Sequence, residues 1–420
     1  MNIKKQNGFT LVEVLVSIAI GAFLLSMVVT VFLGARATSK ATTGIARSQE
    51  STRFASYFIN RDLRLSGFFE CSKGISLRDW TNTASDDFVP SIPDGVFGWE
   101  FTGTGADDNY DLDYQQLGQD FTDAELTAAR ASNSAAASSW TGSTVLGFDS
   151  NNSIPLELPA AIAALNPMRG SDIVVTSISV PLEVKVEANA NLLIPTLSVV
   201  DEFGISTQSD IAAGTMLKIG DCSSADSFQN YAPPGDFITA VAAPGAGAVS
   251  PGNAIDGTFQ WQKKWSSADT VYETKATVYY IGTGASGQPA LFSFSTKCGF
   301  SDTADECDVV STELVDGVEN MQLLYGEDLD GESGTGASSA LNPDNVANAF
   351  LTADQVGSFR RVVSIKVGLV VRSPDAGLDI GPNTTFPEFE VLDQVTINPP
   401  DDANQRFVNN TTLRLRNRGL

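Results

Sequence analysis

The chain has 420 residues, enough for one large core or two subdomains, and its 26 basic and 50 acidic side chains give a net charge of −24. It contains no histidine, which removes the commonest general base and zinc ligand and every Ser-His-Asp or Cys-His arrangement. Residues 1–70 carry 8 basic and 4 acidic side chains, a net +4, so residues 71–420 carry −28. A body this acidic repels polyanions, so direct nucleic-acid binding is disfavoured, and we predict no cofactor.

The first predicted element is an apolar helix. Residues 1–7 are short and polar, with Lys4 and Lys5 as their charges, and residues 9–33 contain Glu13 as their sole ionisable side chain. A helix of that length covers about 37 Å, enough to cross a bilayer core with some tilt. Two lysines ahead of it favour an orientation with the rest of the chain outside the cytoplasm.

Glu13 is unusual because an acidic group inside a membrane helix is costly and usually has a partner. One interpretation is that it lies near the interface and is hydrated. The other requires a cut between Gly8 and Phe9, which would leave a new α-amino group on Phe9, one helical turn from Glu13. The amine and the carboxylate could then pair within one chain or between adjacent helices of an assembly.

This stretch resembles the type III signal of type IV pilins and pseudopilins, matching it at Gly8, Phe9 and Glu13. The resemblance implies that residues 1–8 are a leader removed by a membrane aspartyl prepilin peptidase, which also methylates the amine of Phe9. Two alternatives remain open. Residues 35–37, Ala-Arg-Ala, offer a site for a conventional secretory signal, although the apolar run before them is too long, and the leader could also stay as a plain anchor.

The helix is predicted to continue to about residue 66. Residues 34–66 contain no proline, and Ala55, Ile59 and Leu63 recur at helical spacing, with Phe54 and Phe58 on a nearby stripe. We therefore predict one long helix over residues 9–66, with an amphipathic second half that places one face on the body and ends at Gly67. An amphipathic linker is the alternative.

The four cysteines are Cys71, Cys222, Cys298 and Cys307, an even set that predicts disulfides in an exported chain. Three pairings are possible, and sequence distance favours Cys298 with Cys307 and Cys71 with Cys222. Free buried thiols or a zinc site are the alternatives, although no C-x-x-C spacing occurs.

The globular body is predicted over residues 67–420. Residues 72–165 have little regular signal, and we interpret them as a loop-rich insertion with a possible helix at 123–139. Residues 313–325 read as a short helix or a turn feeding a strand, and 361–372 as a strand central in its sheet. Further strands are predicted at residues 172–178, 216–219, 237–241, 276–281 and 291–294. The predicted fold class is α+β, pilin-like, with the long helix packed on an antiparallel sheet.

Two stretches carry weaker candidate sites. Residues 406–418 alternate apolar and basic side chains, which predicts a final strand whose exposed Arg414, Arg416 and Arg418 balance nearby acids or dock an acidic partner. Asp328, Asp330 and Glu332 place oxygens at alternate positions as a calcium loop would. The EF-hand pattern nevertheless fails at Ser333 and Ser339, so a solvated acidic turn is the favoured interpretation.

Four blocks in the same order are similar to the PilW family of minor pilins: residues 60–71, 217–222, 316–326 and 413–418. The resemblance implies a non-enzymatic protein that primes type IV pilus assembly and lies near the pilus tip. It also implies an inner-membrane anchor with a periplasmic body before assembly. The implied partners are the prepilin peptidase, other minor pilins, the major pilin, the inner-membrane assembly machinery and a PilY-type adhesin. The alternatives are a minor pseudopilin of type II secretion, an adhesive module built on residues 72–165 and a tethered enzyme. Whether twitching motility, adhesion or DNA uptake depends on this chain stays open.

Overall fold

The computed structural model describes twenty segments of the chain. They are residues 10–67, 76–80, 95–101, 112–113, 140–141, 158–187, 191–201, 203, 210–221, 223–242, 249, 252–255, 257–298, 310–328, 345–353, 355–357, 359–373, 389–392, 395–398 and 404–415. The predicted α+β class is confirmed, because one long helix lies against a body made of mainly antiparallel sheets.

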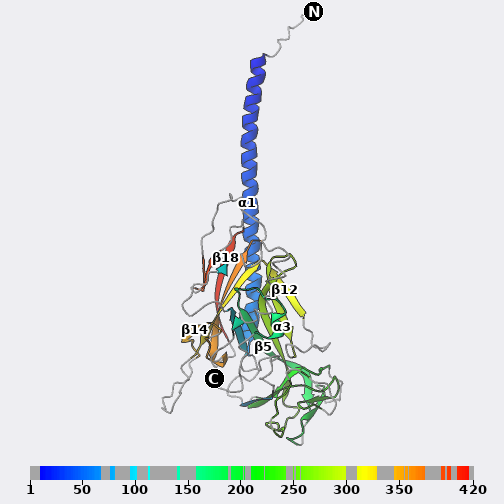
Figure 1. Cartoon of the computed structure of the whole chain (residues 1–420). Helices are drawn as coiled ribbons and strands as arrows, with labels where there is room; N and C mark the ends of the chain where they lie inside the picture. The colour runs from blue at the N-terminus through cyan, green and yellow to red at the C-terminus, as the bar shows by residue number, and fades with distance from the viewer. Residues whose placement is uncertain are drawn as a thin grey trace, which may run out of the picture.

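Helix α1 runs unbroken over Leu11–Leu65, close to the predicted bounds. Figure 1 shows its first half projecting alone and its second half entering the body. The helix ends where the sequence predicts. Gly67 has a φ of 69°, a left-handed backbone conformation that residues other than glycine rarely adopt. The Gly67 backbone N–H then donates to the carbonyl of Ser177, 2.9 Å away, which fixes the exit of the chain onto the sheet.

The largest sheet is built on two long antiparallel strands, β5 (Ile173–Val186) and β10 (Thr270–Thr283), and has the order β1-β8-β7-β10-β5-β2-β4. Strands β11 and β12 extend it from β10, and β6 and β9 extend it from β5. The bounds of these other strands are β1 Ser76–Asp79, β2 Val96–Phe101, β4 Trp140–Thr141, β6 Thr196–Val200, β7 Met216–Gly220, β8 Ser224–Gln229, β9 Phe237–Thr239, β11 Pro289–Thr296 and β12 Val310–Asp316; the short helix α3 is Ala160–Ala163.

A second sheet has four antiparallel strands in the order β14-β13-β15-β18. They are β14 (Ala349–Leu351), β13 (Val318–Glu327), β15 (Val362–Arg372), which follows the 3-10 turn η3 (Phe359–Arg361), and β18 (Arg406–Arg414). The central position predicted for residues 361–372 is confirmed, because β15 pairs with β13 on one side and β18 on the other. A small third sheet joins β16 (Phe389–Val391), β17 (Val395–Asn398) and β3 (Leu112–Asp113).

Residues 313–325 form two strands joined by a turn, so the turn feeding a strand that the sequence offered for this stretch is confirmed and the short helix is wrong. Strand β12 ends at Asp316, Gly317 turns the chain with a φ of 82°, and β13 begins at Val318. The remaining predicted strands at residues 172–178, 216–219, 237–241, 276–281 and 291–294 all coincide with strands, and β5 and β10 are much longer than predicted.

The region described from sequence as a loop-rich insertion contains a buried strand that we did not predict. Strand β2 pairs with β5, and its Phe97 and Trp99 side chains are almost completely buried. Its Gly98 lies so close to the hydroxyl of Tyr325 and the carbonyl of Ile173 that a Cβ would be 2.1 Å and 2.4 Å from those oxygens. The possible helix at 123–139 lies outside the described residues.

The body has two main cores. The larger lies between α1, the β5–β10 sheet and the second sheet, and the other gathers Phe228, Trp261 and Trp265 around β6, β7, β8 and β9. Figure 1 places the green strands of this second core at the end of the body farthest from the projecting half of α1.

Candidate functional site

The start of α1 holds Glu13 in a reciprocal cap with Thr10. The Glu13 Oε2 atom accepts hydrogen bonds from the Thr10 backbone N–H (3.0 Å) and from the Thr10 hydroxyl (3.0 Å), and the Glu13 N–H donates to the Thr10 Oγ1 (3.3 Å). Such a box satisfies N–H groups that the first helical turn leaves without partners. The Glu13 carboxylate is therefore directed back toward Thr10, the residue that follows Phe9 in the sequence. Gly8 and Phe9 lie outside the described residues, so the cleavage and methylation site stays a prediction.

The first half of α1 presents apolar side chains on all sides. The large apolar side chains between Leu11 and Leu33 are 47% to 77% exposed. Within the described segments, α1 is the one helix long and apolar enough to cross a membrane. A helix that is hydrophobic all round needs a membrane or other apolar helices around it, so this half is the candidate membrane anchor.

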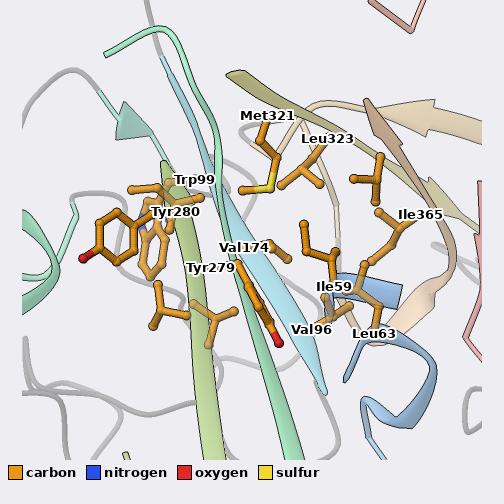
Figure 2. Close-up of a cluster of buried hydrophobic side chains, with 14 of the residues drawn as sticks. Ile59, Leu63, Val96, Trp99, Val174, Tyr279, Tyr280, Met321, Leu323 and Ile365 are labelled. Carbon is orange, nitrogen blue, oxygen red and sulfur yellow. The ribbon is translucent and has the colours of Figure 1, made fainter. Parts of the chain in front are cut away.

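The second half of α1 is docked on the body by a stripe of apolar side chains. Ala55, Ile59 and Leu63 are fully buried, as the helical spacing predicts, and Figure 2 shows Ile59 and Leu63 directed into the core toward Val96 and Ile365. Burying a side chain of that size stabilises by about 1.5–3 kcal/mol. The prediction that Phe54 and Phe58 form a second apolar stripe is only half correct. Phe58 packs against the core, whereas Phe54 is 43% exposed.

Polar contacts tie the last turns of α1 to both sheets. The Tyr279 hydroxyl on β10 donates to Asp62 Oδ2 over 2.6 Å, and Arg61 Nε lies 2.7 Å from Asp62 Oδ1. Burial and the charge of Asp62 raise the pKa of Tyr279, so the phenol stays a donor. On the other sheet, Asn409 Nδ2 donates to Ser56 Oγ over 2.7 Å. Sequence reasoning missed the Asp62–Tyr279 pair. The one signal in the sequence was Asp62 itself, an acidic residue that lies between the apolar Ile59 and Leu63 of the docked stripe.

Tyr279→Phe should lower the free energy of unfolding by about 1.5–3 kcal/mol, because a buried carboxylate loses a charge-assisted hydrogen bond. Urea unfolding of the full chain in detergent measures it. Tyr280→Phe is the matched control, since its hydroxyl bonds only to a neutral group among the described contacts, the Ser311 hydroxyl at 2.7 Å. That control should cost about 0.5–1.5 kcal/mol. Equal losses for the two variants would contradict a special role for the Asp62 contact.

The basic residues of the C-terminal strand have two different environments. Arg414 is exposed, with Nη2 3.4 Å from the carbonyl of Asn345, while Arg416 and Arg418 lie outside the described residues. Arg406 instead points inward. Its Nε lies 2.7 Å from Glu319 Oε2 and its Nη2 3.1 Å from Glu319 Oε1, which also lies 3.3 Å from Arg372 Nη1. The sequence did not reveal this buried triad, and a docking role for Arg414 stays a prediction.

The calcium prediction gains no support at its one described residue. Asp328 is 3% exposed, its Oδ2 accepts from the Asn345 N–H over 2.8 Å, and its own N–H donates to the Arg361 carbonyl over 2.9 Å. The contacts are those of a carboxylate that closes a loop. Asp330 and Glu332 lie outside the described residues, within which no group of three acidic or sulfur ligands gathers.

Cys298 is disulfide-bonded and fully buried at the end of β11. Its N–H donates to Thr296 Oγ1 over 3.0 Å. Because Cys71, Cys222 and Cys307 lie outside the described residues, the pairing remains a prediction.

The second core contains a buried carboxylate surrounded by N–H donors. Asp226 Oδ1 accepts from the Trp80 indole over 3.3 Å, and Oδ2 accepts from the Trp265 indole over 3.1 Å and the Gln262 backbone N–H over 3.0 Å. Burial raises the pKa of Asp226 to about 6, although the three donors and the charge of Arg78 oppose the rise.

Two parts of the chain match known families. Residues 278–417 match the family described as type IV pilus-assembly protein W, and residues 3–29 match the prokaryotic N-terminal methylation motif. No curated protein and no solved structure matches the chain. The shorter match contains Glu13 and most of the anchor, and the longer contains β13, β15 and β18, which pack against α1.

Proposed function

Because the chain is a PilW-like type IV pilin, we propose that this minor pilin primes assembly of the pilus and lies at or near its tip. The observation that carries the proposal is the single unbroken helix α1, apolar and exposed in its first half and fixed to the body in its second. Such a helix can leave the membrane and enter a filament with its body attached. The matched family is one of pilus assembly, so the proposed role is structural rather than catalytic.

The proposed mechanism has two stages. The chain is first held in the inner membrane with its body in the periplasm, and the prepilin peptidase removes residues 1–8 and methylates Phe9. Subunits then associate through their apolar helices, where the Phe9 amine of one chain meets the Glu13 carboxylate of another and sets the register. Both hydrogen bonds that the described residues make to the Glu13 side chain end on Oε2. The Oε1 atom is thus the one we assign to a neighbouring amine.

Glu13→Val should leave the chain in the inner membrane but lower its amount in sheared pili at least about tenfold, a loss that needs only about 1.4 kcal/mol of pairing energy. Quantitative immunoblots of membranes and of sheared pili measure the two amounts. Ser17→Ala, one turn further along and bonded only to the Glu13 carbonyl in the described structure, is the control and should be incorporated normally.

N-terminal sequencing of the variant separates the possible causes. A chain that starts at Phe9 and yet stays in the membrane supports the register role of Glu13. Normal incorporation of Glu13→Val would contradict that role, and a mature chain that starts at Met1 or beyond Ala37 would contradict the processing step.

The proposed partners are other minor pilins, the major pilin, the inner-membrane assembly machinery and a PilY-type adhesin. Affinity capture of the tagged chain from sheared pili, with mass identification of bound proteins, tests them. Pilus number in a deletion strain, with and without the chain restored, tests priming. Recovery of the chain along the whole length of the pili in immunogold images would contradict the tip location.

A further inference from the structure

A row of polar side chains crosses neighbouring strands of the largest sheet. Asp79 on β1 is paired with Ser227 on β8, and Ser227 is paired with Lys218 on β7. On its other side, Lys218 is paired with Tyr272 on β10. Residues paired across a sheet point to the same face, so these four side chains share one side of it. Both neighbours of Lys218 in β7 belong to the second core, which places the row on the opposite face.

The row is shielded from water. Lys218 is 2% exposed, Ser227 and Tyr272 are each 3% exposed, and the Oδ2 atom of Asp79 is buried. Burial lowers the pKa of the free Lys218 amine to about 7, and the charge of Asp79 opposes that fall. A lysine of this kind is neutral far more often than an exposed one, and a neutral amine is a nucleophile.

The side chains of Lys218 and Asp79 can meet over the strand between them. Neighbouring strands lie about 4.8 Å apart, so the Cα atoms of Lys218 and Asp79 are separated by roughly 10 Å across β8. The flexible four-carbon stem of lysine covers most of that distance, and the residue it crosses, Ser227, is small. Two groups held together in this way react as if at very high concentration, because no encounter from solution is needed.

We propose that Lys218 and Asp79 become joined by an intramolecular amide cross-link, an isopeptide bond, once the chain has folded. A proton first passes from the Lys218 ammonium to the Asp79 carboxylate, which leaves a neutral amine and a carboxylic acid. The Nζ lone pair attacks Cγ of Asp79 and forms the new N–C bond. The bond from Cγ to the hydroxyl breaks, and the hydroxyl leaves as water with one proton from Nζ. The step needs no oxidant, reductant or further reactant.

The surroundings favour the amide over the separate groups. An amide carries no net charge, so it removes the cost of keeping an ammonium and a carboxylate away from water. The exclusion of bulk water also opposes the reverse reaction, hydrolysis. The bond would fix β1, the first strand after α1, to β7 of the same sheet. It forms within one chain, so the inference does not depend on a place in the pilus.

Peptide mass mapping of the full chain, purified from membranes in detergent, tests the proposal. The chain is reduced and alkylated, so that no disulfide can join two peptides, and is then digested with chymotrypsin. We expect most of the chain to give a branched peptide that contains both Lys218 and Asp79 and is lighter by one water than the two linear peptides together. Fragmentation should place the branch at Nζ of Lys218. Recovery of both residues in linear peptides alone would overturn the proposal.

Two controls make the measurement specific. Lys218→Arg keeps a positive charge but has no amine, so it should give the linear peptides alone, and a branched peptide that persists there would overturn the assignment to Lys218. Lys297 and Glu273 serve as a control within the same digest. They also place an amine near a carboxylate, 3.9 Å apart, but their side chains are 31% and 25% exposed. This hydrated pair should stay unjoined, and an equal yield of branched peptide from it would show that burial is not what drives the reaction.

Discussion

Glu319→Gln should lower the free energy of unfolding by about 3–5 kcal/mol, the loss typical of removing one partner from a buried ion pair. Glu319 is 2% exposed at its side chain, and the Arg372 and Arg406 side chains that face it are each 4% exposed. Glutamine keeps the volume but removes the negative charge, which leaves two guanidinium groups close together without it. Urea unfolding of the full chain in detergent, followed by circular dichroism, gives the change in midpoint.

Glu273→Gln is the control for this measurement. Glu273 lies 3.9 Å from Lys297 in a pair whose side chains are 25% and 31% exposed. Pairs of that kind contribute about 0–1 kcal/mol, so the control should unfold nearly as the unmodified chain does. Equal midpoints for Glu319→Gln and the control would contradict a structural role for the buried triad.

The location of the triad gives this prediction a functional consequence. Glu319 is the second residue of β13, Arg372 closes β15 and Arg406 opens β18, so the triad joins three strand ends. The neighbouring Ser373 lies against α1 at Gly44, where an added Cβ would be 3.4 Å from the Ser373 Cβ. We therefore expect loss of the triad to loosen the sheet where α1 first meets the body, and with it the rigid link between anchor and body.

The helix could be predicted closely because its signal is local. The apolar run, the absence of proline and the glycine at position 67 all lie within the helix or next to it. Strand β13 was predicted only as one of two alternatives, because it is buried along its whole length although it contains Glu319, Asn320 and Gln322. These polar side chains mimic one face of an amphipathic helix in the sequence.

Distant partners satisfy the polar side chains of β13 in the folded chain. Asn320 Nδ2 and Gln322 Nε2 both donate to the carbonyl of Gly170, over 2.6 Å and 2.8 Å. The Asp62 side chain of α1 also has a distant partner, Tyr279, which is 217 positions away in the sequence. Contacts of this length leave no periodic trace in a single sequence, so the docking residues of the helix were predictable only on their apolar side.

The second large effect is a pH dependence in the core that contains Trp261 and Trp265. The pKa of Asp226 is raised from its ordinary 3.8 to about 6, so the folded chain binds this proton more tightly than the unfolded chain does. The free energy of unfolding therefore falls as the pH rises from about 4 to about 6. Above that window the charged carboxylate costs on the order of 2–3 kcal/mol, and below it the cost disappears.

Asp226→Asn should remove that dependence. Its free energy of unfolding, minus that of the unmodified chain, should rise by about 2–3 kcal/mol between pH 4 and pH 6.5, because the amide cannot ionise. Taking the difference cancels the titration of the other acidic groups, and buried Lys218, whose pKa burial lowers to about 7, titrates above the window. Tryptophan fluorescence follows the local transition, since Trp80 and Trp265 both donate to this carboxylate. A flat difference for Asp226→Asn over the same range would show that the carboxylate titrates normally in the folded chain.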